Sequence, residues 1–254
     1  MKRENWYLST IDHQAQTLAV QYGLGLEIAE YCTDSNMDDL YAQTDALVRS
    51  KLRGISRRVL HGPFNELFPC AIDPKARALA RERYIQAIAL ARDYGANKVV
   101  IHGGYNPRIY YPCWYTEQSI LFLREFLREI PQGMEVCLEN VLEEEPGMLI
   151  DIVRAVEDPR LRLCLDVGHV NAYSKIPAVE WVERCAPWLS HFHIHNNDGS
   201  WDTHSALNQG TLPMEKLLDL AQQVCPEGSY TLELAQAEES VLWLIQKKLM
   251  EDVQ

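Results

Sequence analysis

Short apolar runs alternate with longer segments of helical periodicity along the chain. Runs rich in β-branched and aromatic residues predict strands at residues 6–9, 26–28, 58–61, 98–102, 135–139, 161–166, 191–195 and 230–234. Helical spacing of apolar positions predicts helices over residues 12–22, 37–52, 73–94, 116–130, 147–156, 178–185, 214–224 and 238–250. This alternation of strand and helix is typical of a parallel sheet covered by helices.

Two α/β architectures fit such an alternation, a closed (β/α)8 TIM barrel and a doubly wound open sheet. No glycine-rich nucleotide loop follows the first apolar run, which disfavours the open sheet. The length of 254 residues is close to the roughly 250 residues typical of one barrel. The sequence has no linker or low-complexity tract. We therefore predict an α/β protein with a single (β/α)8 TIM-barrel domain over residues 1–254.

Six consecutive predicted strands end in a side chain that can bind a metal ion. These residues are His61, His102, Glu139, Asp166, His195 and Glu233. Because the carboxyl ends of all strands in a parallel barrel lie at one face, we expect these side chains to converge at one mouth. Alternation along each strand places the residue two positions earlier inside the barrel, in a packed layer below the mouth. Those residues are Val59, Val100, Cys137, Cys164, His193 and Thr231.

Further ligand types follow two of these strands. His169 comes three residues after Asp166, and Asp202 and His204 lie in the loop after the seventh predicted strand. Burying several carboxylates and imidazoles in one pocket without a cation would cost on the order of several kcal/mol, through desolvation and like-charge repulsion. A mixture of imidazole and carboxylate, with no thiolate needed, suits Zn²⁺, Mn²⁺ or a similar divalent ion.

Other polar and aromatic residues near the predicted mouth are less specific. Strand parity places His193 one layer below His195, and we interpret it as a core residue or one that supports a ligand, rather than as a ligand itself. His13 is interpreted as a surface residue. Three aromatic residues follow the fourth predicted strand, and either line the site or pack beneath a loop: Tyr110, Tyr111 and Trp114.

Composition narrows the class of partner. The formal net charge is −12, and the sequence pI is about 5.1, which disfavours a nucleic-acid partner. The first residues carry no apolar signal segment, and no apolar run approaches the ~18 residues that span a membrane. The seven cysteines include no C-x-x-C pair, and Cys137 and Cys164 lie within apolar runs as candidate core residues. We expect a cytoplasmic protein with reduced thiols and no membrane partner.

Short motifs between Val59 and Glu233 carry a resemblance to a known superfamily. The motifs are His61-Gly-Pro-Phe64, Val100-Ile-His102-Gly-Gly104, Leu138-Glu139-Asn140, Leu165-Asp166-Val-Gly-His169, His195-Asn-Asn-Asp198 and Asp202-Thr-His204. As a set they resemble the xylose isomerase-like TIM barrels. That superfamily includes endonuclease IV, of AP endonuclease family 2, and many sugar isomerases and epimerases.

The resemblance implies a ligand set. Endonuclease IV holds three zinc ions with nine ligands, and each ligand has a matching position in this chain. By that resemblance one ion is bound by His61, His102 and Glu139. A second shares Glu139 with Asp166, His195 and Glu233. A third is bound by His169, Asp202 and His204. The epimerases need only Glu139, Asp166, His195 and Glu233, and there the two Glu also act as acid and base.

Two loops depart from the pattern of endonuclease IV. The fifth predicted strand is followed by the acidic segment Asn140–Glu145, and the loop Cys32–Asp39 has no arginine to enter a DNA groove. Phe64 alone matches the position of an intercalating aromatic residue. The resemblance therefore supports the metal-binding frame better than a DNA-binding surface, and favours a small sugar or sugar-phosphate substrate over DNA.

Three functions follow from these observations. The leading hypothesis is phosphoester hydrolysis at a multinuclear zinc site, because it uses all nine ligand-type residues. The alternative is isomerisation or epimerisation of a sugar or sugar phosphate, with one ion and the pair Glu139 and Glu233. A second alternative is a non-enzymatic metal-binding or sugar-binding protein. Nothing in the sequence defines an oligomeric state.

Overall fold

Eight parallel strands form a closed barrel in the computed structural model, which describes residues 1–251. The strands follow one another around the barrel in chain order, and β8 pairs with β1. Their bounds are β1 Trp6–Ser9, β2 Gly25–Ile28, β3 Arg58–His61, β4 Lys98–His102, β5 Glu135–Glu139, β6 Leu161–Asp166, β7 Leu189–Ile194 and β8 Ser229–Leu232. The predicted (β/α)8 TIM barrel is confirmed.

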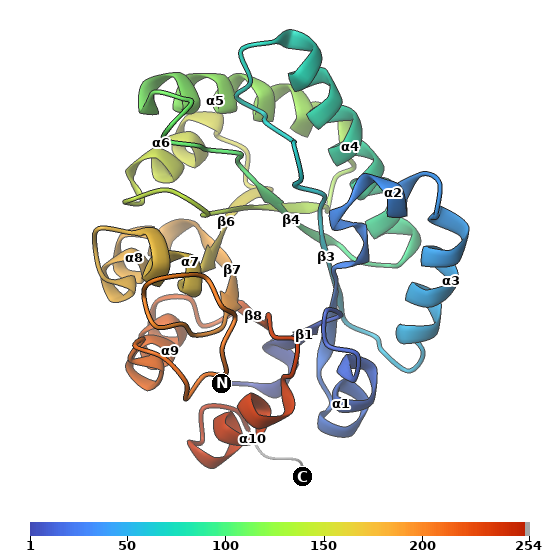
Figure 1. Ribbon diagram of the computed structural model, residues 1–254, viewed down its shortest axis with the longest axis vertical. Coiled ribbons are helices and arrows are strands. Elements are labelled where there is room, and N and C mark those ends of the chain that lie inside the picture. Colours follow the sequence, from blue (N-terminus) through green and yellow to red (C-terminus); the bar gives the residue numbers. More distant parts are fainter. Residues whose placement is uncertain (252–254) are drawn as a thin grey trace.

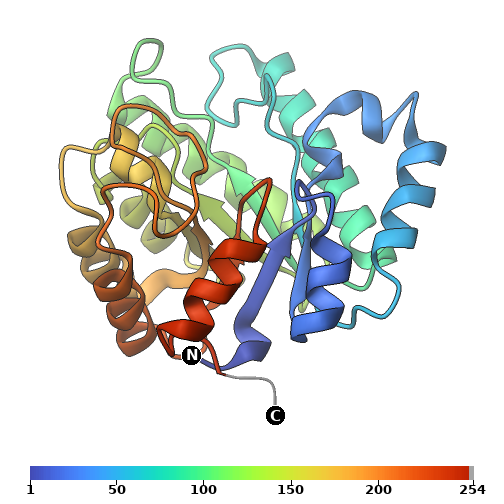
Figure 2. The same ribbon diagram turned by 60° about the horizontal axis from the view of Figure 1, so that its bottom comes forward.

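Helices form a ring around these strands (Figure 1). The α-helices are α1 Ala15–Tyr22, α2 Asp34–Met37, α3 Tyr41–Lys51, α4 Pro74–Asp93, α5 Pro112–Glu129, α6 Gly147–Val156, α7 Val167–Tyr173, α8 Ala178–Cys185, α9 Met214–Val224 and α10 Glu238–Gln246. Short 3-10 segments are η1 Arg3–Asn5, η2 Glu30–Cys32 and η3 Ala186–Trp188. Figure 2 shows the N-terminus at the lower edge of the barrel, and the loops that follow the strands at the upper edge.

The strand ends position the site, and two of them differ from the sequence prediction. Strands β3 to β6 have the predicted bounds and end at a potential ligand. Strands β7 and β8 instead begin earlier and end before His195 and Glu233. After Ile194 the chain leaves the parallel ladder, because Asn196 pairs in antiparallel fashion with Ser205. Both side chains therefore lie just beyond their strands.

Several helix predictions need correction. The helix predicted over residues 37–52 is α3, because α2 ends at Met37 and a turn separates the two, and the last helix ends at Gln246. Helix α5 starts at Pro112 rather than at Thr116, which suits the first turn because proline has no N–H to leave unpaired. Helix α7 lies where the sequence pattern predicts a loop. It forms because the Asp166 carboxylate accepts a hydrogen bond from the backbone N–H of His169 at 2.6 Å, as an N-cap.

The barrel interior has an apolar side and a polar side. Val59, Val100, Cys137 and Cys164 form a buried apolar cluster, as predicted. The opposite side carries buried polar residues, which are Glu27, His191, His193 and Thr231. A separate and much larger apolar core fills the space between the strands and the surrounding helices. Within residues 1–251, no helix is long and apolar enough to cross a membrane.

Two tryptophans test the packing of the outer shell. Trp181 of α8 is fully buried, whereas Trp201 is 66% exposed. We expect Trp181→Ala to lower the free energy of unfolding by about 3–5 kcal/mol, because it leaves a large cavity. Trp201→Ala should change it by less than about 0.5 kcal/mol. Urea unfolding measures both, and equal effects would contradict the assigned packing.

Candidate metal centre at the barrel mouth

The residues predicted as ligands gather at the C-terminal mouth of the barrel. Four of them end β3, β4, β5 and β6: His61, His102, Glu139 and Asp166. His195 and Glu233 follow β7 and β8, and His169 lies in the first turn of α7. Asp202 and His204 lie in the connection between β7 and α9. Figure 1 shows α7 between α8 and β7, and α7 contacts both.

The first group surrounds the buried carboxylate of Glu139. The Nε2 atoms of His61 and His102 lie 3.4 Å and 3.2 Å from Glu139 Oε2. The His61 Nδ1–H donates to the backbone carbonyl of Gly62 at 2.9 Å, so its Nε2 carries the lone pair toward the carboxylate. Phe64 stacks on His102, with ring centroids 4.5 Å apart, and closes this side of the group.

The second group brings Glu139, Asp166 and Glu233 together around His193. The His193 Nδ1 lies 3.1 Å from Glu139 Oε1, 3.2 Å from Glu233 Oε2 and 3.8 Å from Asp166 Oδ2. The sequence pattern predicts His195 at this place and His193 in the core. Strand pairing explains the difference, because His193 of β7 pairs with Asp166, so the two side chains leave the barrel wall at one level.

His195 connects this group to the outer part of the mouth. Its Nε2 lies 3.0 Å from Asp166 Oδ2, and its ring stacks on that of His204 at 3.9 Å between centroids. Potential ligand atoms of His195, His204 and Glu233 lie within 4.8 Å of one another. His195 therefore lies on the outer side of the candidate metal centre.

The third group has Asp202 at its centre. The Nε2 atoms of His169 and His204 lie 3.3 Å and 3.0 Å from Asp202 Oδ2. The Nδ1–H of His169 donates to the backbone carbonyl of Asn140, and that of His204 donates to the carbonyl of Glu233. Both rings therefore turn a lone pair toward a carboxylate that can only accept. Two acceptors that face each other need a cation or a proton between them.

Unpartnered buried atoms support the same conclusion. Glu139 Oε2, His195 Nδ1 and Asp202 Oδ1 are buried and have no hydrogen-bond partner among residues 1–251. Leaving such atoms unpaired is costly, and a divalent cation bound by them removes that cost. Imidazole and carboxylate groups without a thiolate are the donor set that Zn²⁺ and Mn²⁺ accept. The residues at the mouth thus fit a divalent ion.

The electrostatics of the mouth favour positive charge. Burial alone would lower the pKa of His169, but Asp166 and Asp202 outweigh it and raise the pKa to about 10. Burial opposes protonation of His204 too, yet its hydrogen bond to Asp202 and the nearby carboxylates raise its pKa to about 9. Burial is the main reason why the pKa of His102 falls below its usual value, against the effect of Glu139.

Glu27 is a residue that the sequence predictions missed. It lies in β2 and is 1% exposed, and its carboxylate accepts hydrogen bonds from His191 and His193, at 3.0 Å each. Burial alone would raise its pKa, but the charge of His193 and the hydrogen bonds of the two imidazoles hold it well below the usual value. The signal available in the sequence was a carboxylate in the middle of a buried strand, which requires a partner.

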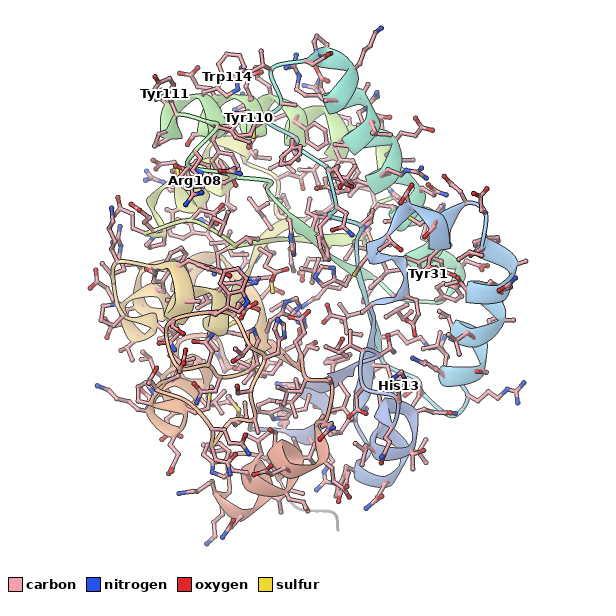
Figure 3. The ribbon with its side chains drawn as sticks, in the orientation of Figure 1. His13, Tyr31, Arg108, Tyr110, Tyr111 and Trp114 are labelled. Atoms are coloured by element: carbon pink, nitrogen blue, oxygen red, sulfur yellow. The ribbon has the colours of Figure 1, made fainter. Side chains whose placement is uncertain are left out.

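The aromatic residues after β4 do not belong to the centre. Figure 3 places Tyr110, Tyr111 and Trp114 at the outer edge of the molecule, and the Trp114 indole N–H donates to the Cys70 carbonyl. The interpretation that these residues pack beneath a loop therefore fits better than the one in which they line the site. His13 is exposed, as predicted, and it lines a cavity that also touches His204.

A closed parallel barrel with a cluster of His, Asp and Glu at its C-terminal mouth defines the class as a TIM barrel with a candidate metal centre. The model of the family described as "Xylose isomerase-like TIM barrel" matches residues 19–247. The chain therefore belongs to this family, and the resemblance seen in its motifs is confirmed.

Curated relatives include proteins of bacteria and archaea. The chain is 28% identical over 186 residues to the uncharacterized protein MJ1311 of Methanocaldococcus jannaschii, which covers 69% of this chain and 63% of that protein. It is 27% identical over 160 residues to fructoselysine 3-epimerase of Shigella flexneri, covering 58% of this chain and 56% of the epimerase. The matches thus span less than two thirds of these relatives.

Solved structures match the chain over almost its whole length. The TTHB071 protein of Thermus thermophilus, from a study of soaking with ZnCl2, is 25% identical, with a TM-score of 0.77. The match covers 96% of this chain and 97% of that one. A D-tagatose 3-epimerase-like protein is 23% identical with a TM-score of 0.76, and the match covers 96% of both chains. The latter likeness shows the fold.

A glycine substitution tests the geometry of the mouth. A Cβ at Gly168 would lie 1.9 Å from His195 Cε1, so Gly168→Ala must displace that ring from Asp166. We expect a loss of about 1–3 kcal/mol in the free energy of unfolding and weaker binding of divalent ions. Calorimetric unfolding and a competing metal indicator measure the two effects.

The matched control is Gly147→Ala at the start of α6, where a Cβ meets no described atom within 4 Å. This variant should keep wild-type metal affinity. If the two variants bind metal equally well, the placement of His195 beside Gly168 is wrong.

Proposed function

We propose that the protein is a divalent-metal-dependent isomerase or epimerase of a sugar-type substrate. The observation that carries this proposal is the convergence of two glutamates, one aspartate and one histidine on a single point at the barrel mouth. These residues are Glu139, Asp166, His193 and Glu233. The similarity to fructoselysine 3-epimerase supports the proposal, and favours the alternative of the sequence analysis over its leading hypothesis of hydrolysis.

The four residues would hold the ion, with His193 in the place that the motifs had suggested for His195. A bound divalent cation supplies Lewis-acid polarisation of a substrate carbonyl and its neighbouring hydroxyl. His193 offers Nδ1 to this point because its Nε2–H is committed to Glu27. A His ligand whose other nitrogen donates to a carboxylate is the usual arrangement in protein metal sites.

Glu139 and Glu233 are the proposed acid and base. One carboxylate removes the proton from the carbon next to the substrate carbonyl, and the other returns a proton, to the opposite face in an epimerase. The Glu139 side chain is 1% exposed and that of Glu233 is 15% exposed, so Glu233 is the one that exchanges protons with solvent. His61 and His102 beside Glu139 help to orient its carboxylate.

Two cavities bear on the substrate class, one that reaches His204 and one that reaches Tyr173, whose ring centroid lies 6.2 Å from that of His169. A cavity of about 710 Å³ touches His204 and is lined by acidic and amide side chains, with no lysine or arginine among its lining residues. A second, of about 480 Å³, is lined by Tyr173 and by Arg108, on the side of the barrel opposite to His13 (Figure 3). The first suits the hydroxyl groups of a neutral sugar. Arg108 is the only lysine or arginine among the described residues that line these two cavities.

Hydrolysis of a phosphoester at a multinuclear zinc site is the second candidate. The observation that favours it is that two more groups of potential ligands flank the four-residue core. They are His61 with His102, and His169 with Asp202 and His204. Clustered ions stabilise both the attacking and the leaving oxygen of a phosphoester. The cleavage of DNA that contains abasic sites separates this candidate from the first.

Deuterium exchange tests the acid–base pair. The Mn²⁺-loaded or Zn²⁺-loaded protein in D₂O should introduce one deuterium next to the carbonyl of a ketose from a panel that includes D-fructose, D-tagatose and fructoselysine. We expect Glu139→Gln and Glu233→Gln to lower the exchange rate by about 10²–10⁴-fold, because each removes a proton-transfer group. NMR of the sugar measures the exchange. Cleavage of abasic-site DNA with no exchange on any ketose would contradict the proposal.

Metal content separates the four-residue core from the outer groups. If the four-residue core holds the ion, His193→Ala should remove both the bound ion and the exchange activity, because the ligand atom Nδ1 is lost. It also predicts that the double variant His102→Ala with Asp202→Ala keeps one ion and at least about one tenth of the activity, since neither residue is in the core. Elemental analysis after dialysis gives the stoichiometry. Loss of all metal in the double variant would instead support a multinuclear site.

A further inference from the structure

The barrel interior beneath the mouth contains a continuous chain of buried polar side chains. Such a chain is unusual, because the interior of a TIM barrel is normally filled by branched apolar residues. Glu27 lies at its centre and is within hydrogen-bond distance of three side chains: His191, His193 and Thr231. Glu27, His191, His193 and Thr231 are each at most 1% exposed.

Hydrogen-bond chemistry fixes the direction of these contacts. A carboxylate only accepts, so the Nε2 of His193, 3.0 Å from Glu27 Oε1, must carry the hydrogen. The Nδ1 of the same ring lies 3.1 Å and 3.2 Å from the carboxylates of Glu139 and Glu233, so without an ion it holds a proton toward them, and a bound ion would take the place of that proton. Because Glu27 keeps the hydrogen on Nε2, Nδ1 is the nitrogen that can bind an ion at the mouth.

The other oxygen of Glu27 is fixed as firmly. It accepts from the Thr231 hydroxyl at 2.5 Å and from the Nε2–H of His191 at 3.0 Å. The Nδ1 of His191 accepts from the hydroxyl of Ser229 at 2.6 Å, and the Lys98 ammonium donates to that same hydroxyl oxygen. The chain of contacts therefore runs from the mouth toward the amino ends of β4 and β8.

We infer that Glu27 is the positioning residue of the metal centre, acting through His193, with His191 and Thr231 holding its carboxylate in place. The inference rests on the proposed function, in which His193 is a ligand. The barrel order places β8 and β1 between β7 and β2, so the 3.0 Å contact between Glu27 and His193 is made across the interior. Glu27 itself contacts no substrate.

Zinc affinity and the tautomer of His193 test this inference together. We expect Glu27→Ala to weaken Zn²⁺ binding by about 10- to 100-fold, measured with a competing chromogenic chelator. Glu27→Gln should lose less, because its amide oxygen still accepts from His193. In metal-free wild-type protein, long-range ¹H–¹⁵N correlation spectra should show His193 with the hydrogen on Nε2. In Glu27→Ala that preference should disappear, with the His193 signals assigned from a His193→Asn variant.

Val59→Ala is the matched control, because Val59 pairs with Glu27 in the neighbouring strand and belongs to the apolar side of the interior. It should lower stability without changing zinc affinity or the His193 tautomer. Equal zinc affinity in the control and in Glu27→Ala, with an unchanged tautomer, would overturn the inference. If Glu27→Ala does not fold, wild-type zinc affinity in Glu27→Met, which keeps the length of the side chain but has no oxygen acceptor, would overturn it.

Failure of the proposed function has a different signature. Wild-type protein that binds no Zn²⁺ would end the proposal of a metal-dependent enzyme. The tautomer of His193 in the metal-free protein would then still decide whether Glu27 positions that ring. A wild-type spectrum with no hydrogen on Nε2 would overturn the role of Glu27, whatever the protein binds.

Discussion

The arrangement of the mouth depends on imidazoles in which one ring nitrogen donates a hydrogen bond to the protein, so that the other nitrogen faces the mouth. In His61, His169 and His204 the Nδ1–H donates to a backbone carbonyl, and in His193 the Nε2–H donates to Glu27. Each ring is left with a lone pair directed at a carboxylate, where two acceptors oppose each other. Such a set of contacts is stable only with positive charge in its midst. The hydrogen bonds behind the rings therefore prepare a cation site before any ion is bound.

Barrel register determines which residues can share one ion. Asp166 and His193 pair across β6 and β7, while Glu139 reaches the same point from the end of β5. His195 is also directed inward but lies beyond β7, so it meets Asp166 from the outer side and stacks on His204. The two-residue step from His193 to His195 thus moves a ring from the four-residue core to the rim of the mouth. The side chains are alike, and only their level along the barrel differs.

Most strand bounds and the gathering of ligand-type residues could be predicted from the sequence. The roles of His193 and Glu27 could not, because they depend on contacts between strands. The bounds of β3 to β6 followed from apolar runs that stop at a polar residue, and the nine ligand-type residues do gather at the mouth. The sequence His191-Phe-His193-Ile-His195 has no such stop, because its inward positions are all histidine. Parity alone cannot choose among them, since the choice depends on the register of the neighbouring strands. Glu27 was missed because its partners come from β7 and β8, far along the chain.

The core and the group around Asp202 are held largely by different parts of the fold. Glu139, Asp166 and His193 stand on strands, and the barrel sets their spacing. His169 is oriented by a loop carbonyl, and Asp202 and His204 lie on the long connection after β7. Loops change more readily than strands, so the ligand-type residues around Asp202 can vary while those on the strands stay fixed. Under the proposed function the four-residue core would hold one ion for proton transfer, whereas the alternative of hydrolysis would also need the loop residues around Asp202.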